Sequence, residues 1–380
     1  TRPRRCSRAR SKVQGAETVW VRLLLALRSR FLLSRRERFL AAYDLDPYRL
    51  IEATARRFET NRPYTSHYVH QLVRHHRDNA LLLLYLESEL GALRRARYFL
   101  RMLSGLLGSP NPFAGKRCLD VGANAGHTLL AFCERGASLA VGVEIEKARY
   151  ETALLNLRGE PEGVRSRLQI HHGDILDTRL AAGLPRFDVI FCLDVIEHVA
   201  DARDLVHNLS TLLSDSPGAF IYIKVGNPHC PQNVLAEPHH RIPGLVLLPR
   251  ELAGRFYEAT RTNPDMPYGV ETWRSFFEYR DLFEERGLRS RAPEEAHISE
   301  ADIERFYRMT EPVLPQFQEF CAAKNVPAGL REEAETHVRA YLAEVRDVFE
   351  RYRATRDPAL DSHIWLKYWP ADVEMVVTRA

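Results

Sequence analysis

The 380-residue chain has few cysteines, and none of them is spaced to hold a metal or to form a redox pair. The six cysteines stand at positions 6, 118, 133, 192, 230 and 321, so there is no C-x-x-C pair and no zinc-finger spacing. Cys118 and Cys192 fall in apolar runs, where a free cysteine behaves as a small hydrophobic residue. This pattern predicts a reduced, cytoplasmic protein and no metal site.

Long apolar runs are also missing from the sequence. The longest run, Ala80–Leu86, has seven residues, whereas a transmembrane helix needs roughly 20. Hydrophobic residues make up 45% of the chain and charged residues 27%, which is an ordinary globular composition. The length leaves room for two domains.

Acidic residues are almost absent from the first 40 positions. This stretch has twelve Arg or Lys but only Glu17 and Glu37, so its net charge is +10 and the rest of the chain carries about −6. A nucleic-acid-binding core is therefore disfavoured, because its positive charge would belong to the folded part. We expect residues 1–14 to be a disordered basic tail, with a transit peptide as the alternative. Trp20–Ala42 is expected to be an amphipathic helix that packs on its own domain or contacts an anionic membrane.

The most informative residues begin at the strand-like run Cys118–Val121. Gly122 and Gly126 follow it and frame a tight turn, and Thr128–Glu134 continues as a helix. A strand, a glycine turn and a helix are typical of the first half of a nucleotide-binding unit. The helix N-terminus of such a unit offers free N–H groups to a ligand.

Two residues of this turn disfavour a dinucleotide. Asp120 lies at the end of the strand, and Asn124 stands where a dinucleotide fingerprint has its middle glycine, which makes the spacing D-x-G-x-x-x-G. This arrangement suits a nucleoside that carries a charged amino-acid tail. A carboxylate at the strand end can face an ammonium or sulfonium group.

Acidic residues recur after the next two strand-like runs. Glu144 ends the run that begins at Ala140 and lies 22 residues after Gly122, about the spacing expected for a carboxylate that holds ribose hydroxyls. Asp174 follows the third run and could accept a hydrogen bond from an adenine amino group, with Ile175 against the ring. Phe187–Cys192 is the fourth run. Since helical segments alternate with these strands, we expect a parallel sheet.

Together these strand ends resemble the class I, Rossmann-like S-adenosylmethionine-dependent methyltransferases, above all those of ubiquinone biosynthesis and their small-molecule and glycan relatives. The resemblance covers roughly Pro112–Arg291. It implies S-adenosylmethionine as the cofactor and an α/β fold: a doubly wound, mostly parallel seven-stranded sheet with an antiparallel last strand. The residues that it implies for cofactor binding are Asp120, Gly122, Ala123, Asn124, Gly126, Glu144, Ile145, Asp174, Ile175, Leu193 and Asp194.

Two helical additions are expected around this fold. Gly105–Pro112 is rich in Gly, Ser and Pro and marks a boundary. The predicted parts are a tail (1–14), an all-helical N-terminal extension (15–110), a methyltransferase core (111–294), a helical insertion (295–365) and the last strand (366–380).

Three histidines are candidate catalytic bases. Methyl transfer from a sulfonium is an in-line displacement, and a hydroxyl acceptor also needs a base to take its proton. His198 follows the fourth strand and is expected to start the next helix, while His239 and His240 follow the fifth strand. His198 could instead only shape the pocket. A metal held by the adjacent His239 and His240 together with Glu237 is disfavoured, because adjacent side chains point in different directions.

We expect O-methylation of a hydroxylated small molecule, sugar or glycan. The fourth strand lacks the Asn-Pro-Pro-Tyr type of run that grips a planar amine. The alternatives are a non-catalytic scaffold, a protein or lipid acceptor, and, least favoured, a dinucleotide oxidoreductase. A partly enclosed acceptor cavity is predicted, unless the helical additions form a homodimer interface instead. Its expected lining is His198, His229, His239, His240, Tyr257 and Tyr268.

Overall fold

The structure is a computed structural model that describes residues 92–261, 267–293 and 297–380. The predicted tail (1–14), the Trp20–Ala42 helix and most of the predicted extension lie outside these residues. The chain divides into two compact units, Thr1–Ala96 and Arg97–Ala380. The second unit begins within helix α5 (Ala92–Leu106) and contains the sheet.

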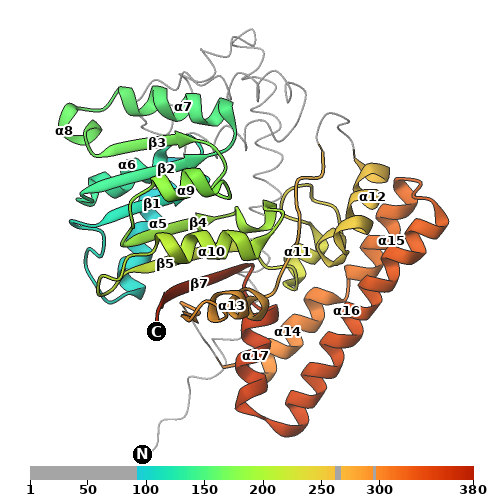
Figure 1. The fold of residues 1–380 in the computed structure, drawn as a ribbon. Helices are drawn as coiled ribbons and strands as arrows, with labels where there is room; N and C mark the ends of the chain where they lie inside the picture. The colour runs from blue at the N-terminus through green and yellow to red at the C-terminus, as the bar shows by residue number, and fades with distance from the viewer. Residues whose placement is uncertain (1–91, 262–266, 294–296) are drawn as a thin grey trace, which may run out of the picture. The chain divides into compact units, whose positions relative to one another are not determined.

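A seven-stranded sheet forms the centre of this unit (Figure 1). Its order is β3-β2-β1-β4-β5-β7-β6, and β7 runs antiparallel to both of its neighbours. The predicted α/β fold class is therefore confirmed, including the antiparallel last strand. The strands are β1 (Arg117–Val121), β2 (Leu139–Glu144), β3 (Leu168–His172), β4 (Val189–Leu193), β5 (Phe220–Gly226), β6 (Leu288–Arg291) and β7 (Asp372–Arg379).

Helices follow the strands as the alternating pattern predicts. Among them, α9, α10 and α13 lie next to one another on the face turned to the viewer in Figure 1. The helices up to β6 are α6 (His127–Glu134), α7 (Lys147–Arg158), α8 (Glu162–Arg165), α9 (Thr178–Gly183), α10 (Ala202–Leu212), α11 (Pro231–Leu235), α12 (Arg250–Thr260) and α13 (Phe276–Glu284), with the 3₁₀ turns η1 (Ile196–His198) and η2 (Leu245–Leu247).

Capping residues explain where two of these helices begin. The Asp201 side chain accepts a hydrogen bond from the Arg203 N–H, so α10 starts at Ala202 and His198 lies in the preceding 3₁₀ turn rather than at the helix start. Ser275 and Glu278 form a capping box, so α13 starts at Phe276.

Apolar side chains of the strands form the first hydrophobic core, which we call the sheet core. Leu119, Ile190 and Ile221 on three adjacent strands are fully buried within it. Helices cover both faces of a parallel sheet, so its strands read as nearly continuous apolar runs. Truncating such a side chain, as in Ile190→Ala, would cost about 2–5 kcal/mol of folding free energy.

Four helices lie between β6 and β7, drawn in orange to red in Figure 1. They pack with α11, η2 and α12 around a second hydrophobic core, the insertion core, which includes Phe256, Phe306, Phe317 and Phe349. The segment after β5 therefore shares its core with residues far ahead in the sequence. The four helices are α14 (Glu300–Thr310), α15 (Val313–Ala323), α16 (Ala328–Thr355) and α17 (Pro358–Tyr368).

A buried asparagine joins the end of β5 to the end of this insertion. The Asn227 side-chain amide donates to the carbonyls of Lys367 (3.0 Å) and Pro370 (2.9 Å). Its backbone N–H donates to the Ala371 carbonyl at 2.9 Å. Since a buried amide must find partners, these bonds hold the loop after β5 against the end of α17.

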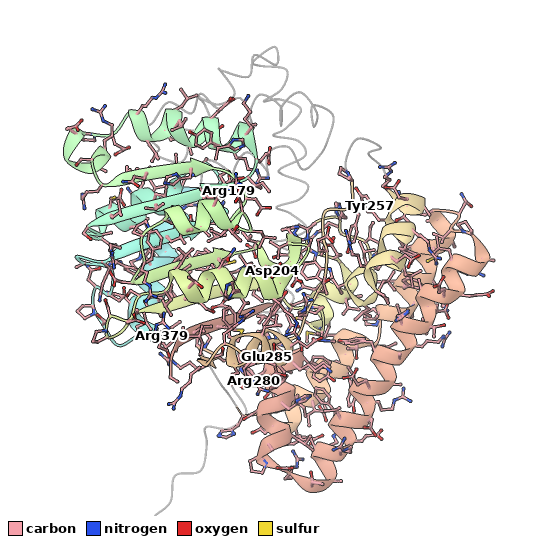
Figure 2. The ribbon with its side chains drawn as sticks, in the orientation of Figure 1. Arg179, Asp204, Tyr257, Arg280, Glu285 and Arg379 are labelled. Carbon is pink, nitrogen blue, oxygen red and sulfur yellow. The ribbon has the colours of Figure 1, made fainter. Side chains whose placement is uncertain are left out.

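Charged side chains cover the surface of this unit (Figure 2). Glu285 at the end of α13 pairs with Arg203, and Arg379 at the end of β7 pairs with Asp215 at 2.9 Å. Exposed pairs of this kind contribute at most about 1 kcal/mol each. Among the residues that the structure describes, no helix combines the length and apolar character needed to cross a membrane.

Candidate functional site

The glycine turn after β1 has the backbone conformation that its sequence predicts. Gly122 has a φ of +74°, and Gly126, which caps α6, has a φ of +80°. At Gly122 an added Cβ would also lie 2.5 Å from Cγ2 of Val195. A side chain is thus excluded by both backbone strain and space.

Glu144 is fixed next to this turn by two backbone hydrogen bonds. One carboxylate oxygen accepts from the Asn124 N–H (2.7 Å) and the other from the Glu146 N–H (2.8 Å), and the side chain is buried. A carboxylate has about four lone-pair positions, so each oxygen can accept one more hydrogen bond. Glu144 is therefore oriented in advance for a pair of hydroxyl groups.

Asp120 is buried at the end of β1, and it forms no ion pair with the other described residues. Burial, together with the nearby charge of Glu144, raises the pKa of its carboxyl to about 8, although a hydrogen bond from Thr128 lowers it. A positive group beside Asp120 would stabilise the carboxylate and relieve this cost. The side-chain oxygen of Asn124 is also buried without a partner in the described part of the chain. Both observations fit a ligand with a cationic group and hydrogen-bond donors.

The two isoleucines among the predicted cofactor-binding residues differ in exposure. Ile175 is packed in the sheet core, whereas Ile145 at the end of β2 is 64% exposed and offers an apolar surface. Asp174 is partly buried and accepts a hydrogen bond from the Leu176 N–H at 2.8 Å. Of the two isoleucines, Ile145 is therefore the one with free apolar surface for a ring.

Asp194 and its predicted neighbour Leu193 lie at the end of β4. Asp194 has a φ of +53°, and its N–H donates to the Lys224 carbonyl at 2.7 Å. The Lys224 ammonium lies 3.3 Å from Asp194 Oδ1 and 3.2 Å from Asp372 Oδ1. Burial opposes the charge of Lys224, but the two carboxylates raise its pKa overall. Sequence reasoning missed this lysine, because nothing in β5 indicates that two acids from other segments would meet it.

Glu197 is the centre of a second group of polar side chains. It is only 1% exposed, and its Oε2 atom has no hydrogen-bond partner among the described residues. Its Oε1 atom lies 3.7 Å from His198 Nε2 and 4.0 Å from His239 Nε2. Burial, helped by the charge of Asp194, raises the pKa of Glu197 to about 7.

A buried carboxylate orients His239 in this group. Glu237, with none of its surface exposed, accepts hydrogen bonds from His239 Nδ1 (2.8 Å) and from the His239 N–H (3.0 Å). Burial alone would lower the pKa of His239, but the bond to Glu237 raises it overall. With Nδ1 donating to Glu237, the Nε2 atom is the one that faces Glu197, and it is free to accept a proton.

The other two predicted bases have different surroundings. His198 Nδ1 lies 2.7 Å from the Gly269 carbonyl, and burial lowers the pKa of the ring. His240 packs against Tyr257 and Tyr268, with ring centroids at 4.4 and 5.8 Å, and burial also lowers its pKa. The structure therefore brings His198 and His239 together at Glu197 and directs His240 into an aromatic group.

Glu197, His198 and His239 also have the geometry of a metal site. One ligand atom from each residue lies within 4.8 Å of the others, and this is the one such group among the residues that the structure describes. The side chains of His239 and His240 point in different directions, as the sequence predicts. His198 instead of His240 is the second histidine of this group. Glu237 would then act as the carboxylate that orients a histidine ligand. The absence of a metal site stays a prediction.

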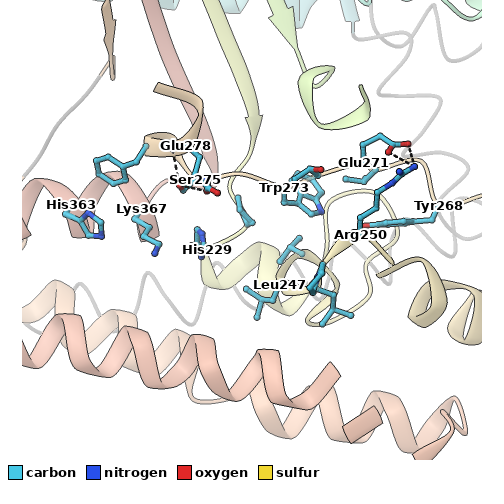
Figure 3. Close-up of a pocket in the computed structure, with 17 residues that line it drawn as sticks. His229, Leu247, Arg250, Tyr268, Glu271, Trp273, Ser275, Glu278, His363 and Lys367 are labelled. Atoms are coloured by element: carbon cyan, nitrogen blue, oxygen red, sulfur yellow. Dashed lines mark hydrogen bonds and ion pairs between the residues drawn. The ribbon is translucent and has the colours of Figure 1, made fainter. Parts of the chain in front are cut away.

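A cavity of about 560 Å³ lies next to this group (Figure 3). Of the six residues predicted to line an acceptor cavity, His229 and Tyr268 do so, and His198, His239, His240 and Tyr257 do not. Figure 3 shows His363 and Lys367 of α17 on one side of it and Arg250, Tyr268 and Glu271 on the other. The lining residues are Pro228, His229, Val246, Leu247, Leu248, Pro249, Arg250, Tyr268, Val270, Glu271, Thr272, Trp273, Ser275, Phe277, Glu278, His363 and Lys367.

Comparison with known proteins matches this unit to one family. The family model described as a methyltransferase domain matches residues 92–292, which are 201 of the 380 residues. The ubiquinone biosynthesis O-methyltransferase of Stutzerimonas stutzeri is 31% identical over 115 residues, which are 30% of this chain and 46% of that protein. The enzyme of the same name from Chromobacterium violaceum is 30% identical over 124 residues, which are 32% of this chain and 50% of that protein.

The chain thus spans about half the length of these relatives. Among solved structures, a putative sarcosine dimethylglycine methyltransferase from Galdieria sulphuraria has 12% identity and a TM-score of 0.37. The similarity covers 67% of this chain and 81% of that one, and it is too distant to bear on function. The family match extends over more than half of the sequence and includes the glycine turn, Glu144 and β1 to β6. The chain therefore belongs to the methyltransferase domain family, the class I, S-adenosylmethionine-dependent methyltransferases.

Proposed function

We propose that this enzyme methylates a hydroxyl oxygen of a small molecule, sugar or glycan. The observation that carries the proposal is the hydrogen bond between buried Glu237 and His239, which leaves His239 Nε2 facing Glu197. A hydroxyl must lose its proton as its oxygen is methylated, and a histidine held by a carboxylate suits that task. The relatives named O-methyltransferases support the same chemistry.

The residues at the ends of β1 and β2 fit the cofactor. Glu144 would accept hydrogen bonds from the ribose hydroxyls, and Asp120 would face the ammonium or sulfonium charge. Ile145 offers apolar surface beside them. When bound, S-adenosylmethionine supplies the methyl group of its sulfonium sulfur, and that sulfur becomes a neutral thioether once the methyl group is transferred.

His239 is a better base than the other two histidines. Its pKa is raised, so it accepts a proton more readily, whereas the pKa values of His198 and His240 are lowered. As the acceptor oxygen takes the methyl group, its proton passes to His239 Nε2. Glu237 then stabilises the imidazolium that forms.

A divalent cation offers a second route at the same three residues. Held by Glu197, His198 and His239, it would bind the acceptor oxygen and lower the pKa of the hydroxyl. Chelation separates the two routes. Loss of turnover that Mg²⁺, Mn²⁺ or Zn²⁺ restores would support the cation, and unchanged turnover would support direct proton transfer.

The proposal is tested by comparing two neighbouring histidines. Turnover is measured as S-adenosylhomocysteine formed from a panel of phenols and glycosides, with the methylated product identified by mass spectrometry. His239→Ala should lower kcat by roughly 10²–10⁴-fold and leave cofactor affinity unchanged, and His240→Ala is the matched control. Full turnover in His239→Ala would contradict the proposal.

A further inference from the structure

The peptide from Tyr268 to Ser275 forms a shared wall between the Glu197 group and the cavity of Figure 3. Its backbone contacts the Glu197 group: the Gly269 carbonyl bonds to His198, and the Glu271 N–H donates to the Glu197 carbonyl at 2.7 Å. Its side chains line the cavity. The cavity is therefore one peptide away from the proposed base.

One wall residue contacts both sides directly. The Trp273 ring lines the cavity and lies 5.5 Å from the His239 ring, measured between centroids. Trp273 is therefore a cavity residue whose ring lies against that of His239. The volume of about 560 Å³ lies within the range of roughly 300–1,000 Å³ that is usual for small-molecule sites.

Aromatic rings provide much of the cavity surface. Tyr268 and Trp273 lie in the shared wall, and Phe277 of α13 stacks on His363 of α17 with centroids 4.7 Å apart. Flat faces of this kind suit a ring, and a small number of polar groups between them would set its orientation.

The charged groups of the cavity already have partners. Arg250 binds Glu271 at 2.6 Å, Lys367 pairs with Glu344, and the Glu278 carboxylate accepts from the Ser275 N–H at 2.7 Å. A phosphate or carboxylate ligand would have to break one of these pairs. The cavity therefore favours an uncharged ligand.

A polar atom of the lining remains available for a ligand. His229 Nδ1 is buried and has no hydrogen-bond partner among the described residues. Burial lowers the pKa of His229 to about 4, so the ring is neutral at pH 7. A ligand hydroxyl can both donate and accept, so it can satisfy this nitrogen in either tautomer. An alkyl chain would leave it unpaired at a cost.

We infer that this cavity binds the body of the methyl acceptor and that it selects an uncharged, polyhydroxylated ring such as a glycosyl unit. The ring lies between Tyr268, Trp273 and Phe277, with one hydroxyl directed past Trp273 toward His239. This inference rests on the proposed O-methylation and adds the class of acceptor and its binding site.

The inference is tested by binding rather than by turnover. Saturation-transfer NMR is recorded on the full chain with S-adenosylhomocysteine present, using methyl glucoside, methyl mannoside and methyl rhamnoside as probes. Glucose 6-phosphate, catechol and hexanol represent an anionic, a phenolic and an alkyl ligand. Leu247→Trp should fill the cavity, because Leu247 lines it and lies outside the Glu197 group. Leu155→Trp is the matched control, because Leu155 is 47% exposed on α7.

We expect at least one glycoside to bind the unchanged protein and Leu155→Trp, and its affinity to fall at least tenfold in Leu247→Trp. If Leu247→Trp does not fold, Phe277→Leu takes its place and should weaken binding severalfold by removing the stacked ring. Three results would overturn the inference: no glycoside binds, filling the cavity has no effect, or only the phosphate, catechol or hexanol binds. Calorimetry measures cofactor affinity in each variant separately from glycoside binding. The proposed O-methylation can therefore survive failure of this inference.

Discussion

The two halves of the candidate site are built in different ways. On the cofactor side, the key residues Asp120 to Glu144 come from one continuous strand-turn-helix-strand segment. On the acceptor side, Glu197 is joined by Glu237 and His239 from beyond β5 and by Glu271 from a still later loop. The first half therefore depends on local sequence, and the second depends on long-range packing between the two hydrophobic cores.

The largest expected effect comes from a substitution in the acceptor half alone. Glu237→Gln keeps the shape of the side chain but removes the charge that stabilises the His239 imidazolium. We expect kcat to fall by roughly 10²–10⁴-fold, the usual contribution of acid–base catalysis, with cofactor affinity unchanged. Steady-state kinetics and calorimetry on the same preparation check both parts.

The pH profile of kcat shows whether Glu237 orients His239 or only supports the fold. Because Glu237 raises the pKa of His239, its loss should move the acid limb of the kcat profile to lower pH. A variant that loses turnover at every pH by the same factor, or that also loses cofactor binding, would place Glu237 in the fold rather than in catalysis.

The same contrast explains what the sequence could predict. The glycine turn, the acids at the ends of β1 and β2 and the first four strands follow from local patterns, because buried strands and tight turns each need particular residue types. Lys224, Glu197 and Trp273 were not singled out, since their importance comes from partners 30 or more residues away. Contact of the N-terminal helix with a membrane, and homodimer formation, stay predictions.

An intermediate effect is expected on the cofactor half. Glu144→Ala removes the carboxylate that accepts hydrogen bonds from two backbone N–H groups, and with it the proposed contacts to the ribose, so the cofactor should bind about 1–3 kcal/mol more weakly. Glu146→Ala is the matched control, because the neighbouring Glu146 side chain is exposed and pairs with Arg149 in the first turn of α7. Calorimetry with S-adenosylmethionine measures the difference. Equal affinity in the two folded variants would remove Glu144 from the cofactor site.

A pH dependence also sharpens the contrast, because it concerns the one acid of the cofactor half with a strongly raised pKa. Without cofactor, burial raises the pKa of Asp120 to about 8, from the ordinary value of 3.8. The folded protein thus holds a proton that the unfolded chain releases, so stability falls as the pH rises from about 4 to about 8. Asp120→Asn should weaken this loss of stability.

Cofactor binding should act in the opposite direction at the same residue. A cation beside Asp120 lowers its pKa, so binding releases a proton, and affinity should rise with pH by at most about tenfold per unit and level off near pH 8. Asp120→Asn should make the affinity nearly independent of pH. S-adenosylhomocysteine, which has the ammonium group but no sulfonium, identifies the cation: an equal slope indicates the ammonium, and a lost slope indicates the sulfonium. If S-adenosylmethionine shows the same pH dependence in the parent and in Asp120→Asn, Asp120 faces neither group.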